Sequence, residues 1–144
     1  MNKRAGIILV SIFILVFLAG LFKGVSDTLQ FHYAKSIFNQ EQYNQSYFNP
    51  TLSWKNKYKD YNSGDKSPAF VASIGPLVAL TDAWHLAQAI QILAWSLALF
   101  LSLFLGTLVL IKRKILFFMT FFLLNYLIFH LGFISAYDWL LILK

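Results

Sequence analysis

Polar side chains recur at regular steps in one otherwise apolar stretch, TDAWHLAQAIQILAW, which covers residues 81–95. It begins with an acid and a histidine, Asp82 and His85, and continues with Gln88 and Gln91. On a helix these steps place His85, Gln88 and Gln91 on one face about 120° wide. The same face continues through Trp95, Ser102 and Gly106. A carboxylate, an imidazole and two amides could bind a polar ligand, hold a metal ion or transfer a proton.

Two further apolar stretches carry polar stripes of the same kind. The first runs through Gly20, Lys23, Asp27, Gln30 and Ala34, and the second through Tyr126, His130, Phe133 and Tyr137. At ~1.5 Å per residue from the basic end of each stretch, Asp27, Gln91 and Tyr137 all lie ~32–33 Å up. His130 lies lower, ~23 Å up, within the hydrocarbon. The sequence therefore predicts one polar layer, shared by three helices: Lys23, Asp27, Gln30, His85, Gln88, Gln91, His130 and Tyr137.

This polar layer has three interpretations. Membrane helices use small and polar residues to pack, so contact between helices comes first, with Lys23 and Asp27 forming an ion pair. Binding of a ligand, a lipid head group or a metal ion comes second, and catalysis third. Ionisable groups inside a bilayer are costly and mark functional sites. His130 is therefore either such a group or a neutral ring bonded to a neighbour such as Asn125 or Tyr126.

A metal centre is the most specific of these alternatives. Asp27, His32, Asp82 and His85 are ligand types that suit zinc or a similar divalent ion. Asp82 and His85 can share a helix face, but His32 lies ~140° from Asp27 on a continuous helix. All four could meet only if the first helix broke near residues 23–24 or unwound near Gln30. We expect no cofactor, and a divalent metal such as zinc is the alternative.

The composition predicts a membrane protein. Hydrophobic residues make up 58% of the 144-residue chain and charged residues 12%, well below the roughly 25% of soluble proteins. Three runs without charge, 5–22, 86–111 and 115–134, each approach the ~20 residues that cross a bilayer. We predict an all-α membrane protein with one domain, 1–144, with spans at 5–24, 86–111 and 115–136 and a structured cap at 25–81. A fourth helix would arise if 25–38 or 68–80 folded separately.

Basic residues indicate the orientation of these spans. Lys3 and Arg4 precede the first span, and Lys112, Arg113 and Lys114 separate the last two. The positive-inside rule then places both groups in the cytoplasm. We predict a bacterial cytoplasmic membrane, a cytoplasmic N-terminus and an extracytoplasmic segment 25–81. The net charge of +6 is explained by these flanks, and nucleic acid is not an expected partner. The chain has no cysteine, so disulfides and thiolate metal sites are excluded.

The predicted cap is rich in aromatic residues and lysines. Residues 53–59, SWKNKYK, alternate in a way that suits an extended strand. Lys55, Lys57 and Lys59 would lie on one face and Trp54 and Tyr58 on the other. At a membrane surface this pattern would hold lipid head groups, and the alternative is an ordinary solvated loop with an aromatic anchor.

The segment before the second span is apolar but short. Residues 69–80 cannot cross a bilayer, and Gly75-Pro76 interrupts them, so we expect an interfacial or re-entrant piece. Thr81 then reads as the N-cap of the following helix, with Asp82 in a favourable place at the positive helix end.

Three blocks of the sequence carry a resemblance. DTLQFHY at 27–33, FNPTLSWKNKY at 48–58 and TDAWHL at 81–86 together resemble a group of uncharacterised small bacterial integral membrane proteins that share them. The resemblance covers residues 26–90. It implies that the three blocks matter, and it supplies no activity or mechanism.

The function expected from these patterns is non-enzymatic. We expect a small membrane protein that binds a lipid or another ligand, or that serves as a subunit of a membrane complex. The alternative is a metal-dependent membrane hydrolase or transferase that acts on a lipid. No glutamate lies in any predicted span, and no convincing Ser-His-Asp order is found. Expected partners are membrane lipids, further copies of the chain or a larger complex.

Overall fold

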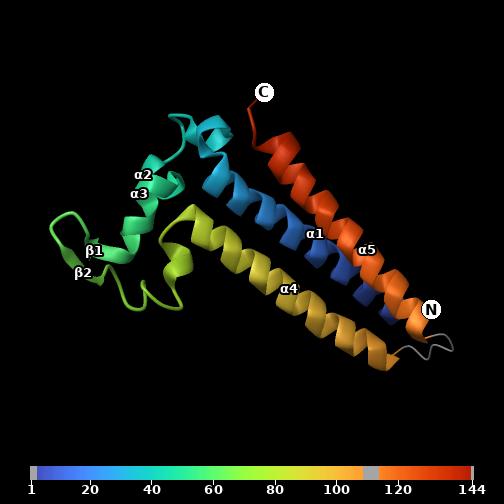
Figure 1. Ribbon diagram of the computed structural model, residues 1–144. Coiled ribbons are helices and arrows are strands. Elements are labelled where there is room, and N and C mark those ends of the chain that lie inside the picture. Colours follow the sequence, from blue (N-terminus) through green and yellow to red (C-terminus); the bar gives the residue numbers. More distant parts are fainter. Residues whose placement is uncertain (1–2, 109–113, 144) are drawn as a thin grey trace.

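Three long helices dominate the computed structural model, which describes residues 3–108 and 114–143. They are α1 (Lys3–Phe31), α4 (Ala83–Leu108) and α5 (Lys114–Ile134). Within the described residues, three helices are long and apolar enough to cross a membrane, as the sequence predicted. Residues 109–113, which include the end of the predicted second span and part of its basic turn, lie outside the described residues. Figure 1 shows α1 between α4 and α5.

Helix α1 is continuous well beyond the predicted span. Its 29 residues correspond to ~43 Å, which exceeds the ~30 Å hydrocarbon core of a bilayer. Residues 25–31 therefore extend this helix and do not form a helix of their own. The polar stripe remains helical through Gln30, whereas Ala34 belongs to a separate short helix, η1 (Tyr33–Lys35). Residues 68–80 form turns and the short η4 (Val78–Leu80), so neither alternative fourth helix is present.

The contact between α1 and α4 is a seam of small side chains. The buried residues of α4 are spaced by four and seven positions: Ala83, Ala87, Ala94, Ala98 and Leu105. Those of α1 that face the same core include Ala5, Ile12 and Val16. This near-heptad spacing keeps one stripe of each helix against the other along their length. The seam fixes α4 beside α1.

The contact between α1 and α5 is closer still, because glycines remove the side chains. A Cβ placed on Gly20 would lie 2.0 Å from the carbonyl oxygen of Phe129, and one on Gly132 would lie 2.2 Å from that of Phe17. Gly24 meets Ala136 in the same way. These small residues, four apart on each helix, let the two backbones touch, as in other membrane helix pairs.

The segment between α1 and α4 folds into the cap, built from short elements. Its aromatic core packs Phe38, Tyr43, Tyr47 and Phe48 against each other and against Leu29 of α1. The strands β1 (Tyr58–Asp60) and β2 (Asp65–Pro68) form an antiparallel hairpin in which Tyr58 lies opposite Pro68 and Asp60 opposite Asp65. The remaining elements follow η1 in order: η2 (Ile37–Asn39), α2 (Gln45–Phe48), α3 (Pro50–Ser53), η3 (Trp54–Lys57), β1 (Tyr58–Asp60) and β2 (Asp65–Pro68).

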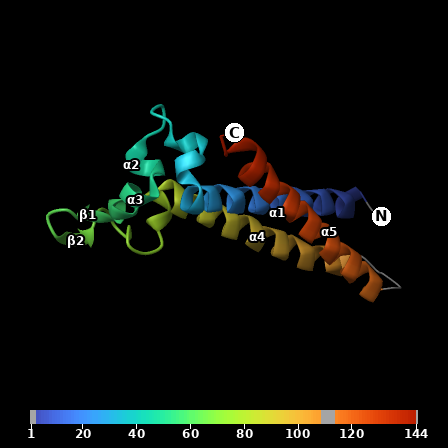
Figure 2. The same ribbon diagram turned by 45° about the horizontal axis from the view of Figure 1, so that its top comes forward.

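The C-terminal end joins the cap. Helix α5 continues into a π-helix, η5 (Ser135–Leu140), and the chain then pairs with the segment after η1. The Ile37 N–H donates to the Leu141 carbonyl at 2.9 Å, and the Leu143 N–H donates to the Lys35 carbonyl at 2.8 Å. The two ends of the chain therefore lie at opposite ends of the helices, as Figures 1 and 2 show.

The predicted strand at residues 53–59 was wrong over its first half. Residues Trp54–Lys57 form the helix η3, and extended backbone begins only at Tyr58. The cause is local: the Asn49 side chain caps the preceding turn by accepting from the Thr51 N–H, and Pro50 occupies its first position. The helical turn started there continues through Lys57 and overrides the alternation.

Lys55, Lys57 and Lys59 consequently do not form one strand face. The rings of Trp54, Tyr58 and Tyr61 gather instead, with the Trp54 and Tyr61 centroids 4.6 Å apart. The Lys55 ammonium lies 5.5 Å from the centroid of Tyr61, and that of Lys57 lies 5.4 Å from the centroid of Tyr58. Lys59 is exposed on β1.

Candidate functional site

The first candidate site is the cap end of α4, where Asp82 is the N-cap. Its Oδ1 accepts from the His85 N–H at 2.9 Å, and its Oδ2 lies 2.6 Å from His85 Nδ1. The prediction that Thr81 caps this helix was wrong by one residue. The Thr81 hydroxyl bonds to the Val78 carbonyl at 2.7 Å and to Asp82 at 3.0 Å. The carboxylate has one oxygen for the backbone N–H of His85 and a second for its ring Nδ1, whereas a hydroxyl has only one oxygen.

Asp82 fixes the histidine ring. The carboxylate is 2% exposed, so it is removed from water, and the ring nitrogen Nδ1 donates to it. Nε2 is then the atom left to accept a proton or a metal ion, and within the described residues it has no hydrogen-bond partner. The His85 side chain is 22% exposed and packs edge-on against Trp84. A histidine oriented by a carboxylate is an arrangement found in metal sites and in proton transfer.

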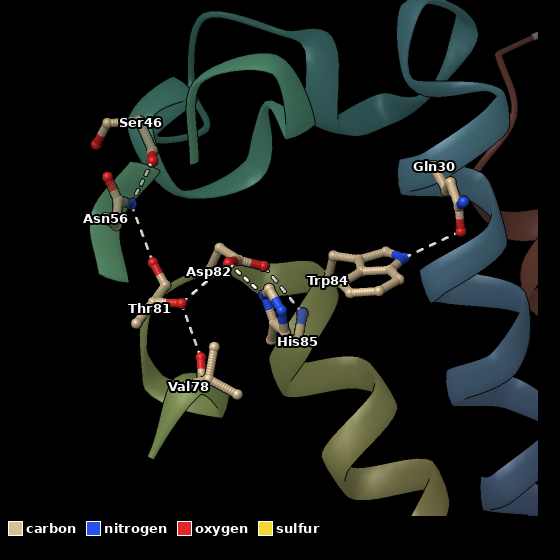
Figure 3. A network of polar contacts seen from close by, with 8 residues as sticks. All are labelled: Gln30, Ser46, Asn56, Val78, Thr81, Asp82, Trp84 and His85. Atoms are coloured by element: carbon tan, nitrogen blue, oxygen red, sulfur yellow. Dashed lines mark hydrogen bonds and ion pairs between the residues drawn. The ribbon is translucent and has the colours of Figure 1, made fainter. Parts of the chain in front are cut away.

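All three sequence blocks meet at this site (Figure 3). Trp84 Nε1 donates to Gln30 Oε1 of α1 at 3.3 Å. Asn56 Nδ2, from the cap, donates to the Thr81 carbonyl at 2.9 Å and to the Ser46 carbonyl at 2.7 Å. Residues far apart in the chain are therefore joined at the start of α4. We call Gln30, Asn56, Thr81, Asp82, Trp84 and His85 the cap junction.

The buried carboxylate affects the cap around it. Burial, together with the negative charge of Asp82, raises the pKa of Tyr47 above its usual value. Burial also raises the pKa of Tyr33, and the hydrogen bond from its hydroxyl to Gln45 opposes this shift. Both phenols therefore stay protonated to higher pH, and of the two only Tyr47 is affected by the charge of Asp82.

The predicted polar layer separates into local pairs. Lys23 forms an ion pair with Asp27 along α1, as expected if these residues are packing contacts. Gln30 accepts a hydrogen bond from Trp84 of α4. Gln88 and Gln91 are half-buried, and neither forms a side-chain hydrogen bond in the described part of the chain. Along α5 and η5, rings stack in one column whose members are Tyr126, His130, Phe133 and Tyr137.

The four proposed metal ligands lie in three places. Asp27 forms an ion pair with Lys23, and His32 packs edge-on against Tyr137 with the ring centroids 5.1 Å apart. Only Asp82 and His85 are in contact. In residues 3–108 and 114–143, no three His, Asp or Glu side chains gather in a way that could hold a metal ion. The metal site stays an alternative prediction.

The second candidate site is a cleft of about 850 Å³ between α4 and α5. Most of its walls are aromatic or aliphatic, and it opens outward because Leu99 and Phe122 are 62% and 70% exposed. Trp95 and Phe129, with ring centroids 5.5 Å apart, meet across it. The lining residues are Trp95, Ser96, Ala98, Leu99 and Ser102 of α4, and Phe118, Phe121, Phe122, Asn125, Tyr126 and Phe129 of α5.

A few polar groups line this cleft. Asn125 is buried, and its Nδ2 donates to the Phe121 carbonyl at 2.8 Å, while its Oδ1 has no partner in the described structure. The Ser102 and Ser96 hydroxyls donate to carbonyls one turn earlier, at 2.7 and 2.8 Å, which leaves their oxygens able to accept. An apolar pocket with a few polar groups is the usual form of a binding site for a small molecule.

The sequence indicated only part of this cleft. Trp95 and Ser102 belong to the polar face of α4 and Tyr126 to the predicted stripe of the third span, but the phenylalanines that form most of the α5 wall carry no such signal. Asn125 was a further signal in the sequence, because an asparagine in a span needs hydrogen-bond partners.

The two candidate sites are distinct. Trp95 and Ser102 lie 12 and 19 residues beyond the start of α4, which is ~18 and ~28 Å along the helix. The cap junction lies at that start. The chain matches no family model, no curated protein and no solved structure, so each site has to be interpreted from its own chemistry.

Proposed function

We propose that the protein is a non-enzymatic membrane protein that binds a lipid, with an apolar chain held between α4 and α5. The observation that carries the proposal is the cleft of about 850 Å³, which lies along helices of spanning length. Its volume falls in the range of ~300–1,000 Å³ that ligand pockets have. Apolar walls do not hold water, so in a bilayer the cleft is filled by hydrocarbon.

Polar groups would distinguish a bound lipid from the surrounding bilayer. A buried acceptor without a partner costs about 1–3 kcal/mol, and Asn125 Oδ1 is such an acceptor. A hydroxyl or amide N–H on the ligand at this depth would give the Asn125 side chain a partner. Gln91 and Gln88 continue the same face of α4, ~6 and ~10 Å beyond Trp95 toward the cap. They could receive the linkage or head group of an amphiphilic lipid whose chain occupies the cleft.

The proposed setting is a bacterial cytoplasmic membrane. The N-terminus lies in the cytoplasm and the cap outside, in accordance with the positive charge at Lys3 and Arg4. The three spanning-length helices, with the C-terminal end beside the cap, support placing the N-terminus and the cap on opposite sides of a membrane.

A substitution that fills the cleft tests the proposal. Leu99→Trp adds a large ring at the cleft wall, whereas Leu103→Trp adds the same ring at a site that is 67% exposed and does not line the cleft. Native mass spectrometry of protein purified in mild detergent should show lipid retained by the wild type and by Leu103→Trp. Leu99→Trp should lose most of it. Equal retention by the two variants would refute a site in the cleft.

A second function, a metal-dependent hydrolase or transferase acting on a lipid, is favoured by one observation. Asp82 orients His85 in the way that a carboxylate orients a metal-binding or proton-accepting histidine. Turnover of phospholipid by purified protein that is abolished by a chelator and by His85→Ala would support this second function. Our first proposal expects no turnover and no effect of the chelator on thermal stability.

A further inference from the structure

Residues 69–80, AFVASIGPLVAL, carry no charge and turn their large side chains outward. Val71 is 87% exposed and Leu80 is 61% exposed. Contiguous apolar groups of this kind are uncommon on a surface in water and mark interaction sites. The other exposed large side chains of the segment are Phe70, Ile74 and Leu77.

The outward arrangement is built into the segment. Ser73 is fully buried, and its hydroxyl donates to the Lys57 carbonyl at 2.7 Å, beside the Ala69 N–H at 3.0 Å. The Gly75 and Leu77 N–H groups both donate to the Ala72 carbonyl. Polar atoms therefore point inward and apolar side chains point outward, which is the reverse of a loop in water. Because these hydrogen bonds fix the turns, the exposure belongs to the fold.

The segment lies where the chain enters the spanning region. It ends directly before Asp82, the N-cap of α4, and Figures 1 and 2 both show it beside the start of that helix. If the span starts at Ala83, residues 69–80, which come shortly before it, lie at the membrane interface. The apolar side chains are thus within reach of the outer leaflet.

The neighbouring hairpin supplies the groups that suit a lipid interface. Lys59 and Lys66 are exposed on its two strands, and Trp54, Tyr58 and Tyr61 form its ring cluster. Aromatic rings favour the head-group level of a bilayer, and lysines are attracted to anionic lipids. An apolar surface bordered by cationic and aromatic side chains is complementary to hydrocarbon beneath phosphate groups.

We propose that residues 69–80 form an interfacial anchor, inserted into the outer leaflet of the membrane that the protein spans. The side chains of Phe70, Val71 and Leu77 lie among the upper acyl chains, while the hairpin stays at the level of the phosphates. The anchor holds the cap junction against the bilayer. It is separate from the lipid site proposed in the cleft, and neither depends on the other.

A spin label at Val71 tests the anchor. The chain has no cysteine, so Val71→Cys, Leu103→Cys and Asn62→Cys each introduce a single attachment site. The variants are placed in vesicles of phosphatidylethanolamine and phosphatidylglycerol, and collisions with oxygen and with a water-soluble nickel complex are compared. Labels at Val71 and Leu103 should favour oxygen, and the label at Asn62, on the hairpin turn, should favour nickel.

Two results would overturn the anchor. A label at Val71 that is as accessible to nickel as the label at Asn62 would show that the segment faces water and is not inserted in the bilayer. If Val71→Cys does not fold, Leu77→Cys serves in its place, because Leu77 is 43% exposed in the same segment. A nickel-accessible label there would overturn the anchor equally.

Discussion

Helix α5 has two apolar faces that behave in opposite ways. One face carries Gly132, continues in η5 with Ala136, and touches the backbone of α1. The other carries Phe118, Phe122 and Tyr126 and leaves a cleft toward α4. Both faces are largely apolar in the sequence, and their main difference is side-chain size. Lipid gives membrane helices no hydrophobic drive to associate, so contact depends on fit. Small residues mark where this chain packs on itself, and large rings line the face that stays open toward α4.

The largest expected effect is the loss of the close contact between α1 and α5. Gly20→Ala would place a Cβ 2.0 Å from the Phe129 carbonyl oxygen, so α1 and α5 would have to separate. We expect a loss in the free energy of unfolding at or above the upper end of the ~1–3 kcal/mol typical of overpacked sites. Unfolding in mixed micelles measures it. Gly106→Ala is the control, because nothing lies within 4 Å of its added Cβ. Equal stability of the two variants would contradict the close contact.

The sequence predicted some of these features and not others, for physical reasons. Three spanning-length helices followed from long uncharged runs, but the first helix was predicted to end at residue 24 and it continues to Phe31. Only the helical spacing of its polar residues through Gln30 indicated the longer helix. The choice of partner did not follow, because Gly20 and Gly132 lie far apart in the chain and only the fold shows that they meet. At Trp54 a capped turn overrode an alternating pattern. At Asp82 the helix began one residue later than the hydroxyl of Thr81 suggested.

The cap junction extends the comparison, because polar atoms there hold α4 in addition to the packing of its small side chains. Asp82→Ala should remove both the cap, worth about 1–2 kcal/mol, and the partner of His85 Nδ1. Asp82→Asn should be milder, since an amide oxygen can still accept from the His85 N–H. Thermal unfolding of the two variants measures the difference. Equal losses would mean that the capping bond at 2.9 Å contributes little.

Two buried oxygens without partners in the described residues give the smallest expected effects. Thr28 Oγ1 lies one turn beyond Gly24, on the side where α1 packs against α5. Asn125 Oδ1 lies on the side of the cleft between α4 and α5. Thr28→Val should leave stability unchanged or raise it by about 1 kcal/mol, with or without lipid. Asn125→Leu should do the same in lipid-free micelles but should weaken lipid retention. Chemical unfolding with and without added phospholipid compares them. If Thr28→Val and Asn125→Leu respond to phospholipid in the same way, the α4–α5 cleft does not differ from the α1–α5 contact in binding lipid.

The location of bound lipid tests the difference between the two sides most directly. A phospholipid with a diazirine in its acyl chain is added to the protein in mild detergent and diluted to remove loosely associated lipid. It is then cross-linked by light, and the modified residues are identified by peptide mass spectrometry. We predict that label concentrates on residues of the cleft, such as Ser96, Leu99 and Phe122. Leu97 and Leu103, which are exposed on α4 but do not line the cleft, should carry little of it. Label spread evenly over both groups would contradict a lipid site between α4 and α5.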